Sequence, residues 1–253
     1  MRTAAGLGDP ASQLRCGDSR RGHLKLAHPS PGCDDRIMRL FDLSHVIEHQ
    51  MITYPGLPGP EIGEHLSFDA SASHYAPGTE FAIGRVSMVA NTGTYLDTPA
   101  HRFRSGHDLA GLPLEGCALL PAVIVDGNDG PIGPSAFSDV DVQGAAVLLR
   151  TGWDRHWGTD RYGDPVHPHL TEAGARTLVE RGAALVGIDS VNIDDTTTGQ
   201  RPAHTVLLAA GIPVVEHLTG LEGVPATGAI FTAVPPAIRG LATFPVRAFA
   251  SVP

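Results

Sequence analysis

The chain has 253 residues, of which 42% are hydrophobic and 18% are charged, proportions typical of a soluble globular protein with a full hydrophobic core. Its formal net charge of -9 argues against a general nucleic-acid-binding protein, and no apolar run reaches the ~20 residues of a membrane-spanning helix. Three cysteines without paired or metal-type spacing indicate free thiols in a reducing compartment, so we expect a cytoplasmic protein.

Residues 1–37 differ from the rest of the chain. They hold six basic residues against four acidic ones, are rich in Gly, Pro and Ser, and contain no hydrophobic periodicity or signal-peptide core. We therefore predict a disordered N-terminal extension followed by one domain over residues 38–253. An ordered arm that embraces a partner subunit is the alternative for the extension.

The body begins with two predicted strands, over residues 40–47 and 81–90. Between them, residues 57–79 open with a Pro-Gly-Pro turn and stay largely polar. We interpret this segment as a loop that flanks a substrate site.

The stretch over residues 91–101, N-T-G-T-Y-L-D-T-P-A-H, carries the strongest chemical signal. Because side chains alternate along a strand, an extended run would put four residues on one face: Asn91, Gly93, Tyr95 and Asp97. Pro99 would end strand pairing and let His101 turn back towards Asp97. A carboxylate and an imidazole four residues apart across a turn suit a metal site or an acid/base pair, and a simple pairing within a loop is the alternative.

Aliphatic runs over residues 122–126, 145–150 and 184–188 indicate strands that are covered on both faces. The clearest helix is predicted over residues 171–181, where Thr171 can cap the start and Gly182 follows the end.

The segment after residue 201 brings a second pair of candidate site residues. A helix over residues 204–210 would rise ~10 Å, and a strand over residues 212–216 would return ~16 Å. A reversal at Gly211 therefore brings Glu216 back near His204, and the spacing permits both to bind one ion. Glu216 is hard to explain structurally, because a buried carboxylate at the end of an apolar strand needs a partner. Four other histidines are expected on the surface or in loops: His107, His167, His169 and His217.

The motif at residues 91–101 resembles that of the metal-dependent hydrolases of the kynurenine formamidase type, the cyclase family, which carry H-x-G-T-H-x-D-x-P-x-H at this spacing. Five residues match: Gly93, Thr94, Asp97, Pro99 and His101. Asn91 and Tyr95 stand where the family has its first two histidines. Four short segments also resemble family landmarks: D-L-S-H at 42–45, Y-P-G at 54–56, G-I-D at 187–189 and P-V-R-A at 245–248.

The resemblance covers residues 39–250 and implies an α/β fold, a single domain of the swivelling β/β/α type. It also implies metal-dependent hydrolysis of an amide, a formamide (as in arylformamidases) or a cyclic amide of a small molecule, by a homodimer or a higher homo-oligomer.

Carried over by position, the family's two-metal site would use residues 91, 95, 97, 204 and 216. The amide of Asn91 is a weak ligand for zinc, and the phenol of Tyr95, with a pKa of ~10, must lose its proton to bind well. We therefore expect one divalent metal per subunit, zinc or manganese, with a water completing the site. Its expected ligands are Asp97, His204 and Glu216.

The resemblance also assigns the catalytic groups. His101 is expected to transfer protons between the attacking water and the leaving nitrogen, and Tyr95 to orient the substrate or stabilise an oxyanion.

Two other functions fit the altered motif. The chain could be a non-catalytic relative that binds a small molecule or a partner, or a lyase or cyclase that uses Asp97 and His101 without metal. Metal content separates the lyase from the hydrolase, and turnover of formanilides or lactams separates the hydrolase from the non-catalytic relative.

Overall fold

The middle strand β7 (Ala146–Arg150) shows how the apolar runs of this sequence build its sheet, in a computed structural model that describes residues 38–127 and 130–252. Ala146 and Leu148 pack into one hydrophobic core, whereas Val147 and Leu149 pack into a second core. Because successive side chains of a strand point to opposite faces, the two cores lie on the two sides of the sheet. The strand is therefore covered on both faces, as its sequence predicts.

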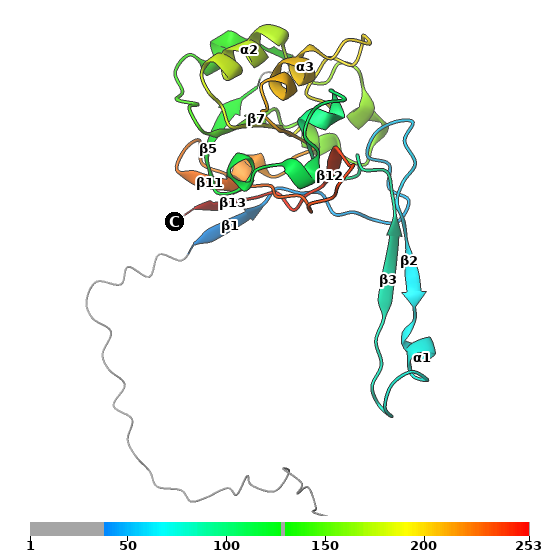
Figure 1. Ribbon diagram of the computed structural model, residues 1–253. Coiled ribbons are helices and arrows are strands. Elements are labelled where there is room, and N and C mark those ends of the chain that lie inside the picture. Colours follow the sequence, from blue (N-terminus) through cyan, green and yellow to red (C-terminus); the bar gives the residue numbers. More distant parts are fainter. Residues whose placement is uncertain (1–37, 128–129, 253) are drawn as a thin grey trace, which may run out of the picture. The chain divides into compact units, whose positions relative to one another are not determined.

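In the described part of the chain, nine strands form one mixed sheet in the order β1-β13-β11-β5-β7-β9-β10-β4-β12 (Figure 1). Besides β7, its strands are β1 (Arg39–Asp42), β4 (Tyr95–Asp97), β5 (Leu120–Asp126), β9 (Leu185–Ile188), β10 (Val214–Glu216), β11 (Ala229–Thr232), β12 (Thr243–Pro245) and β13 (Phe249–Val252). The central strands β5, β7, β9 and β10 pair in parallel, and the flanking strands pair antiparallel to their neighbours. The carboxyl ends of the parallel strands therefore meet at one edge, where open α/β sheets bind ligands.

Helices α2 (Glu172–Glu180) and α3 (Pro202–Ala209) lie together on one face of the sheet (Figure 1). The predicted caps of α2 are confirmed, because Thr171 Oγ1 accepts a hydrogen bond from Gly174 N at 3.0 Å and Gly182 takes a left-handed φ of 73°. Helix α3 begins two residues before the predicted start, since Pro202 at its first position is already set for a helical φ.

Residues 57–79, predicted as a loop, include a strand and a short helix. Strand β2 (Glu61–Leu66) pairs antiparallel with β3 (Ile83–Ser87), and helix α1 (Phe68–Ser71) follows β2, so that an arm extends from the sheet (Figure 1). The segment reads as polar because both faces of this two-stranded arm are solvent-exposed in the single chain. A further short pair joins β6 (Pro131–Ile132) and β8 (His169–Leu170) in parallel.

The predicted α/β class and the single domain are confirmed, with one compact unit over Ile37–Pro253. The predicted extension over residues 1–37 lies outside the described residues. Within the ranges that the structure describes, no helix combines the length and the apolar character needed to cross a membrane.

Candidate active site

The candidate site forms where β4 and β10 lie side by side beneath α3. In this antiparallel pair Tyr95 lies opposite Glu216, and Asp97 lies opposite Val214. Opposed residues share a face, and Val214 packs in the core that holds α3, so the Tyr95, Asp97 and Glu216 side chains point towards that helix. The predicted extended run holds only from Tyr95 onward. Gly93 takes a left-handed φ of 64°, which turns the chain before the strand begins.

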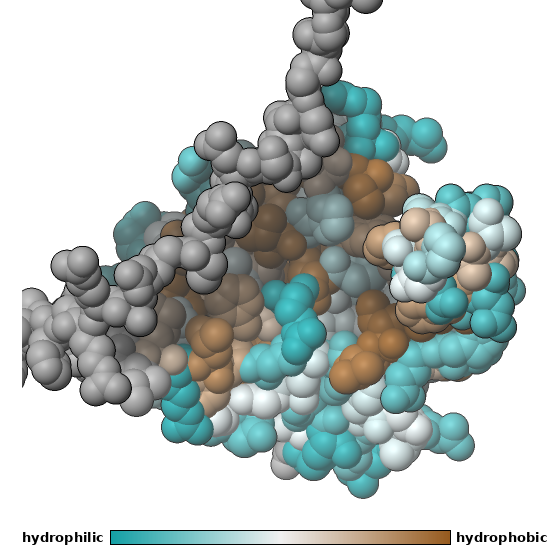
Figure 2. Space-filling model, turned by 90° about the horizontal axis from the view of Figure 1, so that it is seen from below, coloured by the Kyte–Doolittle hydropathy of each residue, from teal (hydrophilic) through white to brown (hydrophobic). Residues whose placement is uncertain are grey.

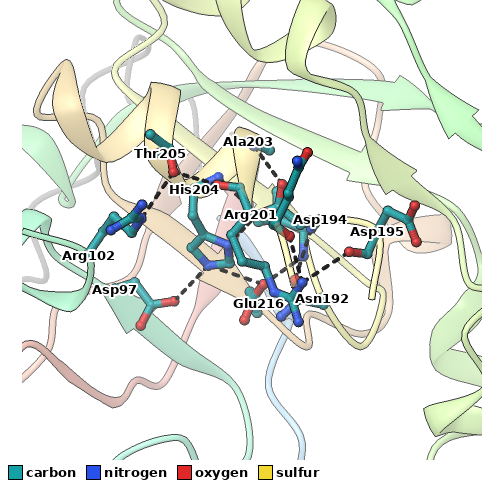
Figure 3. Close-up of polar contacts among 12 residues, drawn as sticks. Asp97, Arg102, Asn192, Asp194, Asp195, Arg201, Ala203, His204, Thr205 and Glu216 are labelled. Carbon is teal, nitrogen blue, oxygen red and sulfur yellow. Dashed lines mark hydrogen bonds and ion pairs between the residues drawn. The ribbon is translucent and has the colours of Figure 1, made fainter. Parts of the chain in front are cut away.

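His204, in the first turn of α3, lies at the centre of the site (Figure 3). Its Nε2 is 3.6 Å from Asp97 Oδ2 and 3.6 Å from Glu216 Oε1, so the predicted return of Glu216 to His204 is confirmed. All three side chains are buried. The second imidazole nitrogen, Nδ1, is 2.7 Å from Asp194 Oδ2. A carboxylate only accepts hydrogen bonds, so Nδ1 carries a proton, and in the neutral ring the lone pair of Nε2 would face Asp97 and Glu216.

Two atoms at this centre have no hydrogen-bond partner. Within the described residues, Asp97 Oδ2 and His204 Nε2 are buried polar atoms without a partner. Buried polar atoms are normally paired, so these two atoms suit a bound cation. An ion bound tetrahedrally with bonds of ~2.0–2.2 Å separates its ligand atoms by ~3.3–3.6 Å. The two 3.6 Å distances from His204 Nε2 fit such an ion, and the residues whose ligand atoms all lie within 4.8 Å of one another are Asp97, His101 and His204.

The charges of the site lead to the same conclusion. Burial lowers the pKa of His204, but Glu216, Asp194 and Asp97 outweigh it and raise that pKa to about 10. Burial raises the pKa of Glu216, and the nearby Asp97 carboxylate raises it further. The two buried acids thus require a positive charge between them. A proton on His204 Nε2 supplies this charge, and a divalent cation would supply it in the place of that proton.

His101 approaches the same centre from the short 3₁₀ turn Pro99–His101, as predicted from Pro99. Its Nδ1 is 3.5 Å from Asp97 Oδ1 and 2.9 Å from Thr243 Oγ1. Thr243, opposite Asp97 in the β4–β12 pair, donates its hydroxyl proton to Asp97 Oδ1. His101 Nδ1–H must therefore donate to Thr243 Oγ1, so that in the neutral ring Nε2 is the nitrogen that can accept a proton. With its side chain 34% exposed, His101 fits a general base.

His101 also fits a metal ligand. One ligand atom each from Asp97, His101 and His204 all lie within 4.8 Å of one another. The roles of ligand and of proton carrier are therefore separable by experiment, not by this geometry.

Tyr95 occupies the place beside Glu216 and is held from both sides. Its hydroxyl donates to Glu216 Oε2 at 2.7 Å. The hydroxyl oxygen of Tyr95 also lies 3.2 Å from His217 Nε2. Burial, together with the Glu216 and Asp97 carboxylates, raises the pKa of Tyr95 well above its ordinary value, so the phenol stays protonated. The expected role of Tyr95 as a hydrogen-bond donor to substrate does not fit this arrangement, because its one proton goes to Glu216.

A cavity of about 380 Å³ opens over these residues. It is lined by Tyr95, His101 and Glu216 on the side of the acids, and by Tyr54, Asn91 and Arg201 among others around them. A larger cavity of about 850 Å³ is lined by Tyr162, by Trp157 and by His45, whose ring stacks on that of Trp157. None of the predicted metal ligands lines the larger cavity, so we assign the chemistry to the smaller one.

Three residues of this site were not found from the sequence: Asp194, Thr243 and His217. Asp194 was visible only as part of an acidic turn after β9, and nothing marks Thr243. His217 and His167, predicted as surface or loop residues, lie outside the helices and strands, but both are almost fully buried. Each ring is held by hydrogen bonds from distant segments, His217 by Tyr162 and His167 by Ser190 and Thr196.

Comparison with known proteins gives one family. A model of the family described as "Putative cyclase" matches residues 41–195. The chain is 28% identical over 209 residues to a kynurenine formamidase of Bacillus mycoides (strain KBAB4), covering 82% of this chain and 94% of that protein. It is also 28% identical over 213 residues to a kynurenine formamidase of Salinibacter ruber (strain DSM 13855 / M31), covering 83% and 96%.

The fold is also found in solved structures. The isatin hydrolase A of Labrenzia aggregata, determined with benzyl benzoate bound, superposes with a TM-score of 0.72 at 26% identity. The match covers 85% of this chain and 94% of that enzyme.

Proposed function

The chain belongs to the cyclase family, and on that premise we propose that it is a metal-dependent hydrolase that cleaves the C–N bond of an amide, formamide or cyclic amide in a small molecule. The single observation that carries this proposal is the buried cluster of Asp97, His204 and Glu216, in which Asp97 Oδ2 and His204 Nε2 have no hydrogen-bond partner, beside a cavity that Glu216 and His101 line. The kynurenine formamidases and the isatin hydrolase with which the chain aligns support the choice of amide bonds.

We propose that Asp97, His204 and Glu216 hold one divalent ion, zinc or manganese. Asn91 and a protonated Tyr95 offer no good ligands for a second ion, which supports a single-ion site. When bound, such an ion supplies a Lewis acid and lowers the pKa of a water.

His101 performs the proton transfers of the proposed reaction. Its unprotonated Nε2 takes a proton from the water that attacks the amide carbon, and it returns that proton to the nitrogen as the C–N bond breaks. The products are a carboxylic acid and an amine, so the atoms of one water are consumed. Thr243 holds the His101 ring through Nδ1, and Tyr95 holds Glu216 through Oε2. Both act as positioning residues.

The test is turnover by protein loaded with zinc or manganese. We expect release of aniline from formanilide or opening of a simple lactam, abolished by a chelator and restored by the metal. Absence of turnover with both substrates and both metals would instead favour the non-catalytic relative. Turnover that survives complete removal of metal would favour the metal-independent lyase or cyclase.

We also propose that the protein is a homodimer joined through its arm. Ile62 and Val86 lie opposite each other on one face of the β2–β3 hairpin and are 41% and 55% exposed. A two-stranded hairpin is at best marginally stable by itself, so another surface packed on these apolar residues would stabilise the arm. Figure 2, viewed from below, shows hydrophobic residues in several places across the middle of the molecule and hydrophilic residues along its rim. A second copy related by a twofold axis would cover the same residues in both chains.

Light scattering during size-exclusion chromatography tests this arrangement. We expect twice the mass of one chain for the parent and one chain's mass for the Ile62→Glu/Val86→Glu variant. Ser87→Glu adds a charge to the opposite face of the same hairpin and should remain dimeric. A monomeric parent contradicts the proposal.

The free, buried Cys117 supports the further prediction of a reducing, cytoplasmic location.

A further inference from the structure

Arg201 is an arginine without an acidic partner at the edge of the candidate site. It lies at the N-terminal cap of α3 and lines the cavity that holds Tyr95, His101 and Glu216. Within the described residues, no carboxylate lies within ion-pair distance of its guanidinium. Its hydrogen bonds all leave from Nη1, to the carbonyl oxygens of Asp195 (3.2 Å), Thr198 (2.7 Å) and Gln200 (2.7 Å).

These three bonds hold one corner of the guanidinium against the loop that precedes α3. The remaining N–H groups of the planar fork are free to bind an acceptor. Figure 3 shows the Arg201 side chain extending from the start of α3 towards the region of Asn192 and Glu216. A half-buried, fixed cation with unused donors in a ligand cavity is suited to a bidentate contact with a carboxylate.

Arg201 also lines a neighbouring cavity of about 500 Å³, whose other lining residues include Arg102 and Arg176. Arg176 Nη2 is already paired with Glu172 at 2.6 Å, whereas Arg102 bonds only to the hydroxyl of Thr205 at 3.1 Å. Among the described residues around the junction of the two cavities, the positive charge that is not neutralised therefore comes from Arg201 and Arg102. On a chain with a net charge of -9, this is a local reversal of sign.

We infer that Arg201, assisted by Arg102, binds the carboxylate of the substrate, so that the preferred substrates are amides or lactams that carry a carboxylate group. Glu216 and His101 line the same cavity as Arg201, so a substrate whose carboxylate is held at Arg201 would have its amide group within the cavity that these residues share. This inference rests on the proposed amide hydrolysis.

The experiment uses two matched substrates, formanilide and 3-formamidobenzoate, which differ by one carboxylate. The ratio of their kcat/KM values is measured for the metal-loaded parent and for Arg201→Gln. We expect the ratio, carboxylated over neutral, to fall about 10- to 100-fold in the variant, as expected for loss of charge-assisted hydrogen bonds. Arg201→Lys keeps the charge without the planar fork and should give an intermediate ratio.

Arg176→Gln is the matched control, because it removes a positive charge near the same junction that Glu172 already neutralises. It should keep the parent's ratio. A second readout is calorimetric binding of 3-aminobenzoate, which Arg201→Gln should weaken by the same factor as the turnover ratio.

The outcomes separate the two proposals. If the parent turns over neither substrate, the proposed hydrolysis fails, and the binding of 3-aminobenzoate still decides the role of Arg201. If the ratio and the binding are unchanged in Arg201→Gln, the inference is overturned. Equal losses in Arg176→Gln also overturn it, because the effect would then be one of general surface charge.

Discussion

Asp194 is the residue whose substitution tests the candidate site most directly. It is fully buried and accepts three hydrogen bonds: from Ala203 N at 2.6 Å, from His204 N at 3.1 Å and from His204 Nδ1 at 2.7 Å. The same carboxylate thus holds the first turn of α3 and fixes the proton of His204 on Nδ1. Asp194→Asn keeps the shape of this side chain but replaces one acceptor oxygen by a donor NH₂.

The magnitude follows from what the amide can no longer accept. In either orientation the NH₂ group faces at least one N–H donor, so at least one charge-assisted bond of about 1.5–3 kcal/mol is lost and a buried donor is left unpaired. We therefore expect the free energy of unfolding to fall by about 2–4 kcal/mol. Metal affinity should fall about 10- to 100-fold, because the imidazole loses the partner that sets its tautomer and orientation.

Chemical denaturation measures the change in stability, and calorimetric titration with zinc or manganese measures the change in metal affinity. Asp195→Asn is the matched control, because it makes the same change of charge one residue away, where the carboxylate accepts only from Thr197. It should leave metal affinity near that of the parent. An Asp194→Asn variant that binds metal as tightly as the parent would refute the proposed role of the Asp194–His204 pair.

Four further predictions address the rest of the molecule. A chain beginning at Met38 should keep the parent's melting temperature and oligomeric state; a marked loss of either would show that the extension packs. The parent should bind one equivalent of metal, and Glu216→Gln should lower the occupancy sharply; two tightly bound equivalents would contradict this. His101→Asn should retain fold and metal but lose about 10²–10⁴ in turnover, whereas loss of the metal would make His101 a ligand. Burial lowers the pKa of His45 to about 4 in the folded state, whereas an unfolded histidine has a pKa of ~6.5. As the pH falls from ~6.5 towards 4, the unfolded state therefore binds this proton before the folded state does, and the free energy of unfolding decreases. His45→Phe should reduce this decrease in denaturation curves measured as a function of pH.

Local patterns in the sequence were enough for the elements that build the fold. The aliphatic runs at β5, β7 and β9 and the caps of α2 need only neighbouring residues to be recognised, and each is present in the structure. The approach of Glu216 to His204 was also predictable, because a short helix, a glycine and a short strand fix the distance between them. The resemblance at residues 91–101 supplied Asp97 as their partner.

The remaining site residues depend on pairings that no local pattern reveals. Thr243 reaches Asp97 only because β12 pairs with β4 across 146 positions of the chain. Gly93 turns the chain before Tyr95, so the alternation assumed for residues 91–97 fails at its first half. Strand β3 lies within the strand predicted over residues 81–90, but β2 was missed because its residues alternate too little between apolar and polar to indicate a buried face.

The surroundings of Tyr95 explain how the altered motif remains compatible with a hydrolase. His217 takes a left-handed φ of 58°, a conformation that costs a non-glycine residue roughly 1 kcal/mol or more and therefore needs local support. Tyr162 provides that support with a hydroxyl 2.8 Å from His217 Nδ1.

Burial lowers the pKa of His217 to about 3, so the ring is neutral. Since Tyr95 gives its proton to Glu216, the ring accepts from Tyr162 at Nδ1 and donates from Nε2 to the oxygen of Tyr95. Every proton of this chain of hydrogen bonds thus points towards Glu216 Oε2, which leaves Oε1 as the oxygen that faces His204. A second ion beside Oε2 would have to displace the Tyr95 proton and reverse the whole chain of bonds. Tyr95 and His217 therefore favour a site with one ion, in which hydrogen-bond donors hold the carboxylate that a second ion would otherwise bind.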